Sequence, residues 1–219
     1  MKLKKLKNLY NNNFGVILSN TVRSFVYLDN FLKYKTIPKL IIIYSKKNIN
    51  QKIKKLLIKV DCNIKIIKSD NVNFTNIGKI VLTSKIDNFI FSGYPGEIVK
   101  NKIFLNKINL IHSHSGLIPK YMGSTTIYYS ILNEKKIHCS TFVMNKDVDQ
   151  GTILLIKRYN LPRKHKVDNY DHIIRAKNLI SLINQKNKKL ILTKNNKKKY
   201  SFFYKAHPVL RNLANKKLI

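Results

Sequence analysis

Two histidines and one aspartate have the types and spacing best suited to chemistry in this sequence. His112 and His114 lie two apart at the end of an apolar run, 108–113, that is typical of a strand. Because side chains alternate along a strand, both imidazoles are expected on one face. Asp149 follows in the segment NKDVDQG. The chain has only 10 acidic residues, so each carboxylate is a candidate for a specific role.

Two kinds of chemistry fit these three side chains. The imidazoles could transfer protons and polarise a carbonyl group, with the carboxylate orienting one ring. Alternatively, two histidines and a carboxylate could bind a metal ion from one side. The neighbouring sequence offers no second carboxylate or third histidine to complete a metal site. The prediction is therefore proton chemistry without a metal.

The elements that must position these residues alternate between strands and helices. Apolar runs of strand length occur at 14–19, 39–44, 63–67, 88–92 and 108–113. Apolar residues at helical spacing occur at 21–33, 50–59 and 168–184. Two further runs, 138–144 and 152–159, predict an antiparallel pair joined through the DVDQG turn. The pattern predicts an α/β fold, with an open, mostly parallel Rossmann-like sheet, helices on both faces, and an antiparallel strand pair after the histidine strand.

The domain division expected from this pattern is simple. An α/β domain is predicted at 1–186, followed by a short basic appendage at 187–219 that packs back on it and contains a short strand at 190–193. In open parallel sheets, ligands bind beyond the carboxyl ends of the strands. Those ends carry the unusual segments GYPGE, after 88–92, and HSGLIPKYMGS, around the second histidine.

The charge of the chain says more about the sign of a ligand than about chemistry. The formal net charge is +33, from 43 lysines and arginines spread over the whole sequence. Such spreading favours a compositional bias over a selected nucleic-acid surface, so nucleic acid is not the favoured partner. In either case the field attracts anionic ligands at low salt.

The same composition bounds the location of the protein. The longest apolar runs are too short to span a bilayer, and the N-terminus lacks the apolar stretch of a secretory signal. The two cysteines, Cys62 and Cys139, cannot form a disulfide framework. We expect a cytoplasmic protein with no membrane partner, and the sequence does not indicate an oligomeric state.

The stretch HSHSGLIPKYMGSTTIYYSILNEKKIHCSTFVMNKDVDQGTIL resembles the central motif of the formyltetrahydrofolate-dependent formyltransferases. That pattern reads Asn-x-His-Pro-Ser-Leu-Leu-Pro-x-Tyr-x-Gly, with Asp-x-Gly later, before a strand. The residues in register with its two parts are His114, Leu117, Pro119, Tyr121 and Gly123, and then Asp149 and Gly151. The resemblance covers residues 88–159 and rests on these positions.

The resemblance implies 10-formyltetrahydrofolate as the formyl donor, a folate-binding segment after the fourth strand, and no metal. It assigns catalysis to His112, His114 and Asp149. The segment implied to bind the folate comprises Ser92, Gly93, Tyr94, Pro95, Gly96, Glu97 and Ile98, and we add Asp147.

Substrate contacts are expected at two other places. Asn20 and Arg23 stand at a predicted helix N-terminus, where an anion could bind, although the glycine-rich phosphate turn of the family is missing. Gly116 allows close approach of a ligand. Ser124 and Thr125 either bind the acceptor or cap a helix, and capping is the expected role.

Two departures from the family pattern keep several functions open. His112 stands where the family has asparagine, and Ser115-Gly116 replaces Pro-Ser. The favoured function is formyl transfer to an anionic primary amine: an amino sugar nucleotide, a purine-pathway amine or an aminoacyl-tRNA. The chain ends early for a well-developed tRNA-binding domain, which makes the tRNA the less expected of these. The alternatives are a hydrolase that releases formate from the folate, and a non-catalytic RNA-associated protein on the same scaffold.

Overall fold

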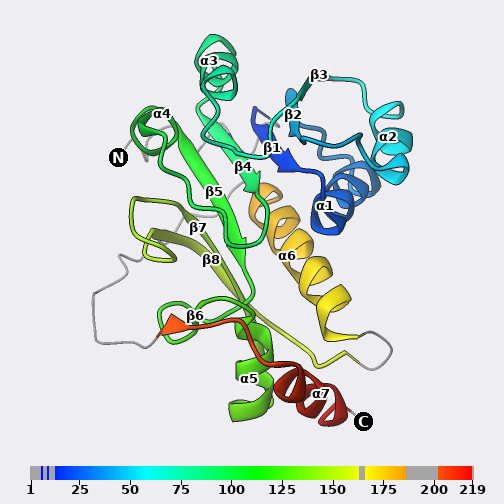
Figure 1. Ribbon diagram of the computed structural model, residues 1–219, viewed down its shortest axis with the longest axis vertical. Helices are drawn as coiled ribbons and strands as arrows, with labels where there is room; N and C mark the ends of the chain where they lie inside the picture. Colours follow the sequence, from blue (N-terminus) through cyan, green and yellow to red (C-terminus); the bar gives the residue numbers. More distant parts are fainter. Residues whose placement is uncertain (1–5, 7–8, 10–12, 163–165, 186–201, 219) are drawn as a thin grey trace. The chain divides into compact units, whose positions relative to one another are not determined.

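The computed structural model describes residues 6, 9, 13–162, 166–185 and 202–218. These residues form two compact units. Unit 1 contains the described residues up to His112 together with 183–185, and unit 2 contains residues 113–182 and 202–218. The boundary between the units passes through one strand, β5, which is labelled with the other elements in Figure 1.

Unit 1 is a parallel α/β unit. Its elements are β1 (Gly15–Ser19), α1 (Val22–Lys33), β2 (Leu40–Tyr44), α2 (Gln51–Leu57), β3 (Asn63–Ile67), α3 (Thr75–Thr83), β4 (Asn88–Ser92), α4 (Lys102–Asn106) and the first part of β5 (Asn109–His114). The strands pair in parallel in the order β3-β2-β1-β4-β5. The order reverses at β1, so right-handed crossovers place α1 and α2 on one face and α3 and α4 on the other. In agreement, α1 contacts α2 and α3 contacts α4.

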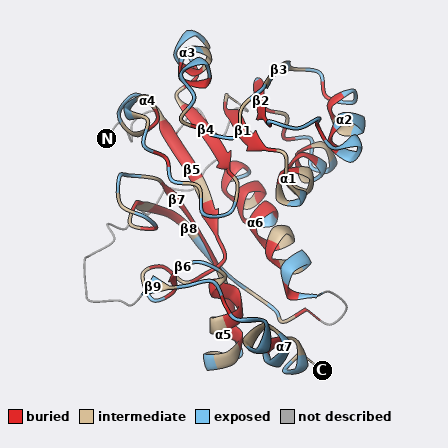
Figure 2. Ribbon diagram, in the orientation of Figure 1, coloured by how far each residue is buried: buried red, intermediate tan, exposed pale blue. Residues whose placement is uncertain are grey.

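The core of unit 1 follows from its continuous apolar runs. Every residue of β1, β2 and β4 is buried, as expected for central strands covered on both faces. β3 forms the edge of the sheet and is largely exposed, a contrast that Figure 2 shows clearly. The point where the strand order reverses, between β1 and β4, is where such sheets place their ligands.

Unit 2 is built around an antiparallel pair. It contains the end of β5, β6 (Met122–Gly123), α5 (Thr126–Glu134), β7 (Ile137–Val143), β8 (Thr152–Tyr159), most of α6 (Val167–Ile183), β9 (Phe202–Phe203) and α7 (Pro208–Lys216). β7 and β8 pair antiparallel with an irregularity after Thr141. β6 and β9 pair in parallel as a separate two-stranded ribbon, and α7 packs against α5.

The predicted fold class is confirmed. One sheet of seven strands has the order β3-β2-β1-β4-β5-β7-β8, mostly parallel, with the predicted antiparallel pair at its end. The short helices α3 and α4 were not predicted, and none of the described helices is long and apolar enough to cross a bilayer. The predicted strand at 190–193 lies outside the described residues. The division at residue 186 also falls there and stays a prediction.

Gly123 should be one of the least replaceable residues of unit 2. Its φ is +103°, and an added Cβ would lie 2.3 Å from the Phe203 carbonyl oxygen in the β6–β9 ribbon. Gly96 is the matched control, because its φ is also positive, at +79°, but nothing lies within 4 Å of an added Cβ. We expect Gly96→Ala to cost about 1–2 kcal/mol of unfolding free energy from backbone strain alone. Gly123→Ala should cost about 3 kcal/mol or more, because β6 and β9 must also move apart to make room for the Cβ. Urea denaturation of both variants measures the difference, and equal losses would contradict the contact with Phe203.

Candidate functional site

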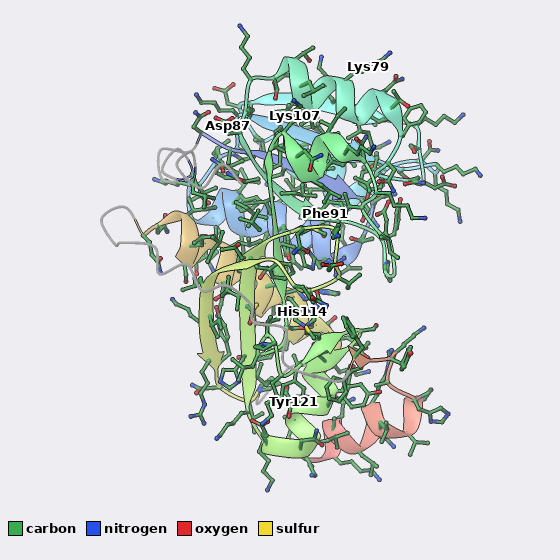
Figure 3. The ribbon with its side chains drawn as sticks, turned by 90° about the vertical axis from the view of Figure 1, so that its left-hand side faces the viewer. Lys79, Asp87, Phe91, Lys107, His114 and Tyr121 are labelled. Carbon is green, nitrogen blue, oxygen red and sulfur yellow. The ribbon has the colours of Figure 1, made fainter. Side chains whose placement is uncertain are left out.

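His114 is the last residue of β5 and belongs to unit 2; Figure 3 labels it together with Tyr121. The ring is 3% exposed. Its Nε2 lies 2.9 Å from the Tyr121 carbonyl oxygen and 3.1 Å from the Thr126 hydroxyl. The Thr126 hydroxyl donates to the Ser115 carbonyl oxygen at 2.8 Å, so it can only accept from the ring. Because a carbonyl cannot donate, Nε2 must carry a hydrogen, and the tautomer of His114 is set by the fold.

Asp149 faces the other nitrogen of this ring. Its Oδ2 lies 3.7 Å from Nδ1 of His114 and accepts a hydrogen bond from the Gly123 backbone N–H at 2.8 Å. The residue has a left-handed backbone, with φ of +54°, in the turn between β7 and β8. Aspartate tolerates that conformation better than most residues. Asp149 is buried, whereas Asp147 in the same turn is only half-buried. Asp149 is therefore the carboxylate beside His114, as the motif register predicts.

The arrangement of His114 and Asp149 is suited to proton transfer. With Nε2 committed as a donor, a neutral ring would present the lone pair of Nδ1 to the carboxylate oxygen, and the two acceptors would repel. A second proton on the ring makes the same contact attractive. The pair can therefore stabilise an imidazolium and can hold a proton between a ring nitrogen and a carboxylate.

His112 lies in unit 1, in the same strand as His114 but with its own partner. Its Nδ1 is 3.2 Å from the Phe91 carbonyl oxygen of β4. The acceptor is again a carbonyl, so Nδ1 carries the hydrogen. The ring lies 6.2 Å, centroid to centroid, from the Phe91 ring. In this tautomer Nε2 of the neutral ring is an acceptor, and it can donate a hydrogen bond only in the imidazolium.

The loop after β4, predicted to bind a folate, is organised by Glu97. Its carboxylate accepts hydrogen bonds from the Tyr94 N–H at 2.9 Å, the Val72 N–H at 2.6 Å and the Tyr44 hydroxyl. Burial, reinforced by the Glu97 carboxylate, raises the pKa of Tyr44 above its usual range, so the hydroxyl stays a donor. Inside the loop, Glu97 N–H donates to Tyr94 O. These bonds hold the loop in one conformation through contacts within the protein.

The two residues predicted to bind an anion at the first helix N-terminus, Asn20 and Arg23, form hydrogen bonds within the protein. Arg23 donates from Nε to the Ser92 hydroxyl at 2.9 Å and from a terminal nitrogen to the Gly93 carbonyl oxygen at 2.6 Å. Asn20 bonds to the Ser45 hydroxyl and to backbone groups of Asn48 and Asn50. Thr21 caps α1 by accepting from the Ser24 N–H. A substrate role for Asn20 and Arg23 stays a prediction.

The residues predicted beside the acceptor have distinct surroundings. Gly116 is packed so closely that an added Cβ would lie 2.8 Å from Nε2 of His114. Ser124 is exposed, and its N–H donates to Phe203 O. The prediction that these hydroxyls cap the following helix is wrong for Thr125. That residue is the N-cap of α5 but makes no side-chain cap bond, because its hydroxyl accepts from the Ala206 N–H at 2.7 Å instead.

The sequence interpretation missed a buried ion pair behind His114. Asp171 and Arg175 on α6 are 9% and 7% exposed, and Nε of Arg175 lies 2.9 Å from Oδ2 of Asp171. Ser115, directly after His114, donates to Asp171. The available signal was the pair of opposite charges four residues apart in a chain poor in acids. Among the described residues, no group of three or more histidines, cysteines or carboxylates gathers in a way that could hold a metal ion.

Comparison with curated proteins finds methionyl-tRNA formyltransferases among the relatives of this chain. No family model matches the chain. A methionyl-tRNA formyltransferase from Orientia tsutsugamushi is 26% identical over 102 residues, which cover 46% of this chain and 33% of the relative. Another from Campylobacter lari is 32% identical over 102 residues, with the same coverage of each chain. The chain thus spans about a third of the length of the curated relatives it matches.

Comparison with solved structures gives the same fold over most of the chain. A 4-N formyltransferase from Francisella tularensis superposes with a TM-score of 0.61 and 16% identity, covering 94% of this chain and 86% of the other. A sugar 3N-formyl transferase, solved in the presence of dTDP and 5-N-formyl-THF, has a TM-score of 0.53 and 21% identity, covering 87% and 69%. A formyltetrahydrofolate deformylase from Pseudomonas syringae pv. tomato has a TM-score of 0.59 and 12% identity, covering 78% and 59%.

The ion pair behind His114 should make stability depend on pH in a specific way. Burial alone raises the pKa of the Asp171 carboxyl, but Arg175, with His172 and the Ser115 hydroxyl, outweighs burial and holds the pKa well below its ordinary value of 3.8. A depressed pKa stabilises the fold fully above the unfolded value, and that contribution is lost as pH falls below about 4. Asp171→Asn should therefore cost about 3–5 kcal/mol at pH 7, because it removes the carboxylate that balances the buried charge of Arg175, and less at pH 3.

Urea denaturation of the wild type and Asp171→Asn at the two pH values measures this change. The control is Asp168→Asn on the same helix, since Asp168 is 64% exposed and lies 4.0 Å from Arg211. That variant should cost less than about 1 kcal/mol. A loss for Asp171→Asn that is the same at pH 3 and pH 7 would contradict an ionised, paired Asp171.

Proposed function

We propose that this chain, which resembles the folate-dependent formyltransferases in sequence and shares their fold, transfers a formyl group from 10-formyltetrahydrofolate to a primary amine. The observation that carries the proposal is the pair of His114 and Asp149, 3.7 Å apart and buried, at the positions that the family motif assigns to catalysis. The chain spans only part of the length of its curated relatives. The proposal therefore rests on the residues of this chain and not on the activity of the whole relatives.

The chemistry proposed for these residues is acyl transfer. The amine nitrogen of the acceptor bonds to the formyl carbon, negative charge develops on the formyl oxygen, and the bond from that carbon to the folate nitrogen then breaks. The attacking amine must lose a proton and the departing folate nitrogen must gain one. His114 and Asp149 are proposed to take up the amine proton as an imidazolium and carboxylate pair and to pass it to the departing folate nitrogen. His112 is proposed to donate a hydrogen bond to the formyl oxygen and so to stabilise its negative charge.

The folate is proposed to bind along the loop after β4, residues 92–98. The loop is held by Glu97 and by the contacts of Arg23 with Ser92 and Gly93. Such prior ordering suits the binding of a flat ring, because the backbone does not have to be ordered on binding. The solved structure that contains 5-N-formyl-THF has the same fold as this chain. A folate contact for Asp147 remains part of the proposal, resting on the sequence alone.

The acceptor is proposed to be an anionic molecule that carries a primary amine. The net charge of +33 attracts anions at long range. Similar proteins are named for methionyl-tRNA, for a sugar and for glycinamide ribonucleotide, so an aminoacyl-tRNA, an amino sugar nucleotide and a purine-pathway amine all remain candidates. A soluble donor and a soluble anionic acceptor would suit a cytoplasmic protein, which is the proposed location. The proposed role of His114 as proton acceptor is the same for each of these acceptors.

Removal of either member of the proposed proton pair should abolish most of the turnover. We expect Asp149→Asn and His114→Ala each to lower kcat by roughly 10²–10⁴-fold, the usual value of a positioned acid or base. Asp29→Asn is the matched control, because Asp29 is an exposed carboxylate on α1 and should leave the rate unchanged. Formylated acceptor is measured by mass spectrometry with 10-formyltetrahydrofolate as donor. Full activity in both site variants would remove the assignment.

A parallel measurement separates donor binding from transfer. 5-Formyltetrahydrofolate should raise the thermal midpoint of the protein in a saturable way, because a ligand that binds only the native state stabilises it. Formate released in the absence of any amine would instead indicate the hydrolase, a reaction that the deformylase of the same fold makes worth testing. Absence of any shift at millimolar folate would rule out the proposed donor.

The tautomer of His112 gives the proposed reaction an unusual pH dependence. Because Nδ1 donates to Phe91 O, Nε2 can donate to the formyl oxygen only in the imidazolium. We therefore expect the contribution of His112 to the wild-type rate to fall as pH rises and its ring loses the second proton. His112→Asn replaces the ring with an amide that donates at every pH, so its rate should not fall in this way.

The informative quantity is the ratio of the two rates. The titration of His114, of Asp149 and of the acceptor amine affects both rates equally, so the ratio isolates the effect of His112. The ratio of the His112→Asn rate to the wild-type rate should rise as pH is raised, because only the wild type loses its donor. A ratio that stays constant would mean that His112 does not act as an imidazolium, and the donor to the formyl oxygen would have to be sought elsewhere.

A further inference from the structure

One buried ion pair on α6 holds the backbone on both sides of His114. Arg175 donates to the Ser113 carbonyl oxygen at 2.7 Å and to the Ser115 hydroxyl at 2.8 Å. These two residues are the immediate neighbours of His114 in the chain. In return, the Ser113 hydroxyl donates to the Arg175 carbonyl oxygen at 3.2 Å. The strand end and the helix are thus joined by bonds in both directions.

Asp171 completes the arrangement by orienting the guanidinium. Its Oδ2 accepts from Nε of Arg175 at 2.9 Å, and its Oδ1 accepts from the Ser115 hydroxyl. The Ser115 hydroxyl therefore accepts from one member of the pair and donates to the other. The guanidinium uses its planar fork to reach three acceptors at once, a geometry that a lysine cannot reproduce.

We infer that Asp171 and Arg175 are positioning residues for His114, acting through Ser113 and Ser115. Because side chains move with their backbone, fixing both neighbours of His114 fixes the direction of its ring toward Tyr121 and Asp149. The inference rests on the proposed function for its catalytic meaning. A buried ion pair is a weak source of stability by itself, since desolvation offsets the attraction, so a positioning role also explains why it is there.

Ser115 is the residue that makes this device particular to the chain. The formyltransferase motif has proline at this position, which cannot bridge an arginine and a carboxylate. The Ser115 carbonyl oxygen accepts from the Thr126 hydroxyl, and the Ser115 hydroxyl accepts from Arg175. Ser115→Ala is therefore a mild second variant that cuts the bridge and leaves the ion pair itself in place.

The experiment compares Arg175→Lys, Ser115→Ala and Tyr159→Phe. Tyr159→Phe is the matched control, because it removes a hydrogen bond between β8 and α6, to Asn178, without touching either serine. Each variant is first shown to be folded by its thermal midpoint. The ring nitrogen resonances of His114 are then followed by NMR in protein labelled at histidine, and kcat and KM are measured for formyl transfer.

We expect the His114 resonances to move in Arg175→Lys and Ser115→Ala and to stay in place in Tyr159→Phe. In the first two variants kcat should fall by roughly 10–100-fold with little change in the KM for the folate, as misplacement of a catalytic group requires. Resonances that stay unchanged in the two folded variants would overturn the inference, even if turnover fell. If the wild type made no formylated product while the resonances still moved, the proposed function would fail and the positioning role would stand.

Discussion

The backbone that follows β5 must leave the sheet while buried, and every carbonyl it turns away from the ladder needs a donor. Besides two backbone bonds within the turn, Gly116 N–H to His114 O and Tyr121 N–H to Leu117 O, unit 2 supplies side-chain donors. The acceptors and their donors are Ser113 O with Arg175, Ser115 O with Thr126, Gly116 O with Ser140, and Tyr121 O with His114. His114 is therefore part of the structural solution as well as the candidate catalytic group, and its tautomer is decided by that structural duty.

Acidic residues are scarce in this chain, and three buried or half-buried ones organise loops. Glu97 gathers two backbone N–H groups and a tyrosine hydroxyl in unit 1. Asp149 accepts from Gly123 beside His114, and Asp171 pairs with Arg175 behind it. Against 43 lysines and arginines, carboxylates are the groups that can accept several hydrogen bonds at once. The strongly basic composition thus leaves the organisation of the candidate site to a few anions.

The sequence predicts the sheet well because its strands are continuous apolar runs with few alternatives, as in β1, β2 and β4. It also selects Asp149 over Asp147, since motif register fixes one position. It does not reveal the partners of Arg23 or of Thr125, because both depend on contacts between segments distant in the chain. The pair of Asp171 and Arg175 was missed for the same reason: helical spacing predicts an apolar face but not which polar residues lie behind a particular strand.

β5 carries His112 and His114 on alternate positions of one strand, and this has a consequence for how the chain can change over evolutionary time. Side chains in a strand repeat every two residues, so the gain or loss of one residue between 109 and 114 would turn the following histidine to the opposite face of the sheet. A substitution in this strand changes one side chain at a time, whereas the insertion or deletion of a single codon moves every following side chain to the other face at once. We therefore regard the length of β5 as more strictly constrained than the identity of most of its residues.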